Sequence, residues 1–105
     1  MIIELLKVKV PPEQREKYIQ NDAEIWTKAL AKYPGFLGKE VWINPNDATE
    51  IVLVIHWATR EDWRTVPQAA LEIIDHQFTQ AMGEYYPIVE SSEYQVRKFP
   101  QKPEE

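Results

Sequence analysis

His56 is the residue whose type and position most directly suggest proton transfer. It follows the apolar run at residues 51–55 and precedes Trp57, so it ends a segment that is otherwise apolar. Histidine is the usual general base near neutral pH, which favours a role for this side chain in a pocket. The alternative interpretation is structural, with the ring capping the edge of a sheet or bonding to a backbone carbonyl. The other histidine, His76, falls outside the apolar stripe of its predicted helix and is expected in solvent.

Asp22 is a carboxylate among apolar neighbours. At about 100° per residue, it lies roughly 40° from the centre of the helical stripe that contains Trp26. A buried carboxylate is unfavourable unless it is paired or hydrogen-bonded, so this position requires a partner. Arg15, two turns earlier on the same face, would make the pair a structural brace. Arg97 or His56, reaching across a cleft, would instead make it part of a functional site, and the sequence fits both assignments.

Several aromatic residues are candidates for the walls of a pocket. A tryptophan buries about 150–250 Å², so packing in the core or at an interface is the alternative role for each of the four. Glu40 lies on a predicted strand and could enter the same cavity, but the sequence does not assign the faces of that strand. The candidate lining residues are Trp26, Trp57, Tyr33, Glu40, Trp42 and Trp63.

Composition argues against several other kinds of site. There is no cysteine, the two histidines are twenty positions apart, and the three glycines form no phosphate-binding loop. We therefore expect no metal site and no cofactor. A net charge of -5 disfavours nucleic acid and anionic membrane surfaces as partners. The apolar runs are too short to span a membrane and no signal peptide is apparent, so the expected location is the cytoplasm.

The elements that must position these residues follow from turn and breaker signals. Pro11-Pro12 ends a first strand at 2–10, and Pro34-Gly35 ends a helix that is expected to run from about residue 12 to residue 33. Strands are predicted at 36–43, at 50–57 and at 92–99. Thr59 is a plausible N-cap for a helical segment that Pro67 interrupts and Gly83 ends after residue 82.

The predicted order is β-α-β-β-α-β, which is the ferredoxin-like α+β arrangement with a four-stranded antiparallel sheet. Residues 1–99 would form a single domain and residues 100–105 a loose tail. Two helices cover one face of such a sheet, yet the run at 51–55 is apolar on both faces. A second copy of the same sheet is the simplest cover for the other face, so the pattern predicts a homodimer.

Two segments carry a resemblance to a known family. They are Tyr33-Pro34-Gly35-Phe36-Leu37-Gly38-Lys39-Glu40-Val41 and His56-Trp57-Ala58-Thr59-Arg60-Glu61-Asp62-Trp63. Together with the order of elements, they resemble the dimeric α/β-barrel superfamily and, within it, the proteins grouped as antibiotic-biosynthesis monooxygenase-like. The chain also resembles a short uncharacterised family of that superfamily, found mostly in photosynthetic bacteria. The resemblance covers residues 2–99, and its motifs specify fold better than chemistry.

The resemblance implies a cofactor-independent monooxygenase that acts on a small aromatic quinol or phenol in a cleft between sheet and helices. In that mechanism, His56 or Asp22 would accept a proton from the substrate and Arg97 would stabilise the resulting anion. The alternative is a non-catalytic module that binds a small aromatic or apolar ligand in the same cleft. The implied assembly is a dimeric barrel in either case.

Overall fold

The computed structural model describes residues 1–100 and 103. Most of the expected tail, residues 101–102 and 104–105, lies outside the described residues. The helices and strands of the described chain are, in order, β1 (Ile2–Lys9), η1 (Pro12–Gln14), α1 (Arg15–Asn21), η2 (Asp22–Thr27), α2 (Lys28–Leu30), β2 (Phe36–Asn44), β3 (Asp47–Trp57), α3 (Arg60–Arg64), α4 (Gln68–Met82) and β4 (Ile88–Gln95).

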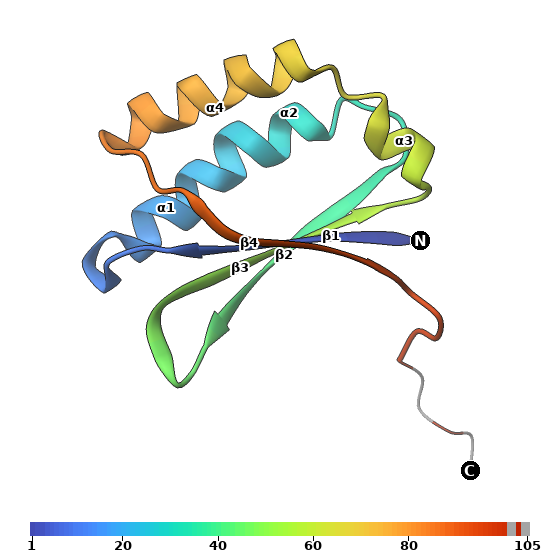
Figure 1. The fold of residues 1–105 in the computed structure, drawn as a ribbon, viewed down its shortest axis with the longest axis horizontal. Coiled ribbons are helices and arrows are strands. Elements are labelled where there is room, and N and C mark those ends of the chain that lie inside the picture. Colours follow the sequence, from blue (N-terminus) through green and yellow to red (C-terminus); the bar gives the residue numbers. More distant parts are fainter. Residues whose placement is uncertain (101–102, 104–105) are drawn as a thin grey trace.

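The four strands form one antiparallel sheet in the order β2-β3-β1-β4. This order and the helical connections confirm the predicted ferredoxin-like α+β fold. Figure 1 shows the helices packed on one side of the sheet, with the other side left uncovered. The sheet therefore has a helix-covered face and an open face.

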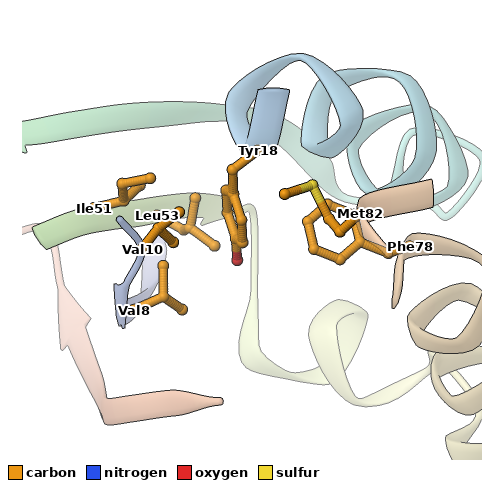
Figure 2. Close-up of a cluster of buried hydrophobic side chains, with 7 residues drawn as sticks. All are labelled: Val8, Val10, Tyr18, Ile51, Leu53, Phe78 and Met82. Atoms are coloured by element: carbon orange, nitrogen blue, oxygen red, sulfur yellow. The ribbon is translucent and has the colours of Figure 1, made fainter. Parts of the chain in front are cut away.

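The core between sheet and helices is built from alternate residues of the central strands. Figure 2 shows Tyr18 projecting from α1 toward Phe78 and Met82 of α4. Tyr18 and Phe78 meet edge to face, with ring centroids 4.9 Å apart. Val8 and Ile51 complete the same cluster from β1 and β3. This packing fixes the first helical segment above the sheet.

The first helical segment is not the single helix that the sequence predicts. A 3-10 turn at η1 leads into α1, then into a π-helix at η2, and the segment ends at α2. A π-turn holds one more residue than an α-turn and often marks a functional position. Asp22 is the first residue of the π-helical part.

The element boundaries confirm some of the expected signals and correct two strands. β3 begins at Asp47 and not at residue 50. The Thr59 hydroxyl accepts a hydrogen bond from the Asp62 backbone N–H at 3.1 Å, and Gly83 ends α4 with a φ of 79°. The last strand, however, is Ile88–Gln95 and not 92–99. Its start directly after Pro87 allows Ile88 to pair with Val8 of β1.

Candidate functional site

A cavity of about 420 Å³ lies between the helix-covered face of the sheet and the helices. This volume is within the usual range for small-molecule sites. Its walls are mainly apolar and aromatic, with a few ionisable groups. The aromatic lining residues are Tyr18, Trp26, Trp57, Trp63, Phe78, Tyr85 and Tyr86, and the ionisable ones besides tyrosine are Glu4, Asp22, Lys39, Glu72 and Asp75.

Strand register places two of the ionisable groups on the cavity floor. Glu4 of β1 and Lys39 of β2 both pair with Ile55 of β3, one from each side. Directly opposite residues in neighbouring strands share a face of the sheet, so both side chains rise toward the helices. The floor therefore carries a carboxylate and an ammonium group on either side of an isoleucine.

Asp22 closes this cluster from the helical side. Its Oδ1 accepts a hydrogen bond from Lys39 Nζ at 2.6 Å, and the two side chains are only 2% and 4% exposed. Burial raises the pKa of Asp22, and the Lys39 charge and hydrogen bond oppose that rise. The prediction that Asp22 is buried and paired is confirmed. The predicted partners were wrong.

The true partner of Asp22 differs from all three candidates for physical reasons. Arg15 lies on the same helical segment, but its Nε is buried without a hydrogen-bond partner among the described residues. Arg97 follows the end of β4 and is exposed. His56 faces the other side of the sheet. Lys39 reaches Asp22 because β2 passes beneath η2 with that side chain pointing inward.

Glu4 is the second carboxylate of the cavity and forms no ion pair, and no hydrogen bond of normal geometry, in the part of the chain that the structure describes. Burial raises its pKa, while nearby Trp57 and the positive charge of Lys39 act in the opposite direction. The Trp57 indole Nε1 is close enough to favour the charged carboxylate, yet it lacks a partner with normal hydrogen-bond geometry. Glu4 and Trp57 Nε1 are thus an acceptor and a donor that a ligand could engage.

His56, Glu40 and Trp42 lie together, but on the open face. His56 Nε2 is 2.6 Å from Glu40 Oε1, and Trp42 Nε1 donates to Glu40 Oε2 at 3.2 Å. Adjacent strand residues point to opposite faces, so these three are separated from the cavity by the sheet itself. The prediction that Glu40 and Trp42 line the cavity is wrong, and His56 does not reach it.

Of the remaining residues that were candidates for the pocket lining, some line the cavity and one does not. Trp26, Trp57 and Trp63 line the cavity as the sequence suggested. Tyr33 packs instead against the cluster around Leu30 and Trp57, outside the lining. Glu4 and Lys39 were missed as a site because nothing in the sequence fixes which face of a strand each occupies. The signal that was available is Asp22 itself, since a buried aspartate requires a cation nearby.

Two further observations concern other kinds of site. Within residues 1–100 and 103, no group of three or more histidine, aspartate or glutamate side chains is arranged to hold a metal ion. Across the same residues, no helix combines the length and the hydropathy needed to cross a bilayer.

With this geometry in place, the family can be read from comparison with known proteins. The antibiotic biosynthesis monooxygenase family matches residues 1–68 of the chain. The chain belongs to this family. The matched region runs from β1 through α3, so it contains Glu4, Asp22, Lys39 and Trp57. A comparison with curated proteins finds no significant match.

Solved structures agree with the family in fold. A protein from Bordetella bronchiseptica assigned to the antibiotic biosynthesis monooxygenases superposes with a TM-score of 0.71 at 15% identity, over 90% of this chain and 95% of that one. One from Deinococcus radiodurans gives 0.68 at 14% identity, over 99% and 100%. A variant of SnoaB, a cofactor-independent oxygenase from Streptomyces nogalater, gives 0.67 at 14% identity, over 96% and 97%. At these identities the likeness shows the fold alone.

Proposed function

We propose that this chain is a cofactor-independent monooxygenase that oxidises a small phenol or quinol bound in the cavity. The observation that carries the proposal is the pairing of aromatic walls with a partly buried carboxylate, Glu4, that is free to accept a proton. Membership of the antibiotic biosynthesis monooxygenase family supports the reaction class. The cavity volume of about 420 Å³ suits a molecule of one to a few rings.

Glu4 is the proton acceptor in this proposal. Burial raises the pKa of both carboxyls and the Lys39 charge opposes both rises. Asp22 is engaged by the Lys39 ammonium group at 2.6 Å, whereas Glu4 forms no ion pair among the described residues, so Glu4 is the carboxylate available to a substrate. The raised pKa of Glu4 brings it closer to that of a phenol than an ordinary carboxyl would be. Trp57 Nε1 and Lys39 Nζ lie at the same floor and supply donors toward the phenolate oxygen.

The proposed reaction uses dioxygen as its only oxidant. The phenolate transfers one electron to dioxygen, and the resulting radical pair combines into a C–O bond at a ring carbon. The proton held by Glu4 returns to give a hydroperoxide. Loss of the ring C–H proton with cleavage of the O–O bond leaves one oxygen as a ring carbonyl, and the other departs as water. All four electrons come from the substrate, so no external reductant is needed.

The test is oxygen uptake with a panel of phenols and quinols, run alongside tryptophan fluorescence to follow binding. Glu4→Gln removes the proton acceptor but preserves shape, so kcat should fall about 100-fold with binding largely retained. Glu93→Gln is the matched control, because Glu93 pairs with Glu4 across β1 and β4 and is held by Arg60 Nε at 2.7 Å. Saturating fluorescence changes without any oxygen uptake would instead indicate the non-catalytic binding module.

We also propose that the protein is a homodimer that pairs the open faces of two sheets. Ile3, Val52 and Val54 form an apolar centre on that face. Trp42 and Tyr94 flank it, and they are 47% and 57% exposed in the single chain. Large apolar side chains gathered on one face are typical of an interaction surface. The two cavities of such a dimer would face outward, away from the shared sheet layer.

A further inference from the structure

We infer that the cavity selects phenols or quinols that carry a positively charged amine and disfavours those that carry a carboxylate. The inference names the substrate class of the proposed function and rests on that function for its chemistry. Its binding component can be tested separately.

The first support is the balance of charge around the cavity. Among the described residues that line it, four are carboxylates and one, Lys39, is a base. Lys39 is already paired with Asp22, so its charge is compensated. Glu72 and Asp75 have no cationic partner in the lining, and Glu4 shares the field of Lys39 without forming an ion pair of its own among the described residues. A ligand carboxylate would add like charge in a partly desolvated space, and a ligand amine would offset it.

The second support is the position of the acidic groups. Glu72 and Asp75 are exposed residues of α4 that also line the cavity, so they lie at its mouth. Glu4 lies at the floor. An elongated ligand would therefore meet two uncompensated carboxylates where it enters and one where it ends.

The third support comes from the aromatic side chains. Trp26 and Trp63 are partly exposed, Tyr85 is 61% exposed, and all three line the cavity. Indole and phenol rings attract an ammonium group through their electron-rich faces. Aromatic rings beside carboxylates are a combination that favours amines over neutral ligands of the same shape.

Trp57 gives the ligand an orientation. Its Nε1 is a buried donor without a hydrogen-bond partner among the described residues, and Trp57 lines the cavity beside Glu4. Such a donor fits the oxygen of a phenol. The phenol end then lies at the floor against Glu4 and Trp57, and the amine lies toward Glu72 and Asp75. When Glu4 takes the phenol proton, the negative charge moves to the ligand, and an amine on the same ring stabilises it.

The experiment compares three ligands that share one ring and one hydroxyl: para-hydroxybenzylamine, para-cresol and para-hydroxybenzoate. Calorimetry at low ionic strength should give a dissociation constant for the amine at least about tenfold below that of the benzoate, with cresol between them. In the variant Glu72→Gln/Asp75→Asn, the gap between the dissociation constants of the benzoate and the amine should fall to roughly threefold. Glu16→Gln/Glu24→Gln changes the net charge equally at exposed positions outside the cavity and should leave the gap unchanged.

The outcomes separate the two proposals. The inference is overturned if the natural chain binds the amine and the benzoate with equal dissociation constants. It is also overturned if both double variants reduce the ratio of those constants by the same factor. If the predicted ranking appears but no phenol or quinol supports oxygen uptake, the selectivity holds and the monooxygenase proposal fails. If oxygen uptake occurs but the predicted ranking of the three ligands does not appear, the monooxygenase proposal holds and the selectivity inference fails. Failure of all three ligands to bind overturns the inference, and the oxygen-uptake panel then decides the monooxygenase proposal by itself.

Discussion

The buried pair of Asp22 and Lys39 joins the helical layer to β2 through two charges that are almost out of contact with water. Bringing both charges out of water is unfavourable, and their attraction offsets that penalty only while both are present. The pair is therefore weak evidence for stability as a unit. It is strong evidence that neither member tolerates replacement alone.

Lys39→Met should lower the free energy of unfolding by about 3–5 kcal/mol, because it leaves Asp22 as an uncompensated buried charge. The double variant Asp22→Leu/Lys39→Met should recover most of that loss. Urea denaturation at neutral pH measures both. A double variant as unstable as the single one would show that the lysine stabilises the fold through packing and not through its charge.

Glu4 should make stability depend on pH in a defined direction. Burial raises its folded pKa above the ordinary value of 4.5, so the folded chain binds this proton more readily than the unfolded chain. Stability is then full below the unfolded pKa and is lost as pH rises through the folded pKa. Glu4→Gln removes this loss, so the variant should be the more stable protein near pH 7, and the difference should shrink toward about pH 4.

Denaturation series across that range, with Glu93→Gln alongside, provide the measurement. Asp22 titrates in all three proteins, so its contribution cancels in the comparison. A stability difference that stays constant with pH would mean that Glu4 titrates as it does in the unfolded chain.

At the scale of the elements, the turn between α2 and β2 depends on Gly35. Its φ is 84°, and a Cβ built there would collide with the side chain of Asp62 in α3. The Gly35 carbonyl also accepts a hydrogen bond from the Ala58 N–H at 2.8 Å, which joins this turn to the end of β3. The turn, β3 and α3 thus meet with no room for a side chain.

Gly35→Ala should destabilise the protein by about 2–4 kcal/mol, from the left-handed backbone and the collision together. Gly83→Ala is the control, since its φ of 79° is similar but open space surrounds it. That change should cost only the backbone part, about 1–2 kcal/mol. Thermal melts of both variants would separate the backbone contribution from the contribution of the collision. Equal losses of stability in the two variants would show that the Asp62 side chain moves aside freely.

The strands also show why the site was harder to predict than the fold. Breakers such as Pro34-Gly35 and the apolar runs are local, so the order of elements followed from them. The face of the sheet that each β2 side chain occupies is not determined by the local sequence. The pairing of β2 with β3 shifts between Phe36 and Gly38, and an irregularity of one residue reverses which side chains point inward. As a result, the Lys39 side chain points into the cavity and the Glu40 side chain points away from it. In β4, sparse apolar residues gave no period by which to place the strand.

At the scale of the whole molecule, the two faces of the sheet have separate tasks in our proposals. The helix-covered face holds the cavity, and the open face exposes Trp42 and Tyr94 beside an apolar centre that is already buried within the chain. An uncovered face of this kind favours self-association over a soluble single chain.

The protein should sediment near twice its mass of 12.4 kDa at micromolar concentration. Trp42→Glu should shift it toward the single-chain mass with the fold retained, because Trp42 is 47% exposed in the isolated chain. Ile73→Glu, at a 61% exposed position on α4, should leave the assembly intact. Sedimentation of the natural chain as a well-folded monomer would overturn the dimer.

In β3, neighbouring residues contribute in turn to both faces of the sheet, and five successive positions are buried. Leu53 and Ile55 line the cavity, while Val52 and Val54 belong to the open face. A library of single substitutions should therefore find no tolerant position from 51 to 55, whereas β4, exposed along most of its length, should accept many. The same alternation makes the two properties separable in evolution. Changes at inward positions can retune which ligand is accepted while their immediate neighbours keep the subunits together, so new specificities can arise on an unchanged assembly.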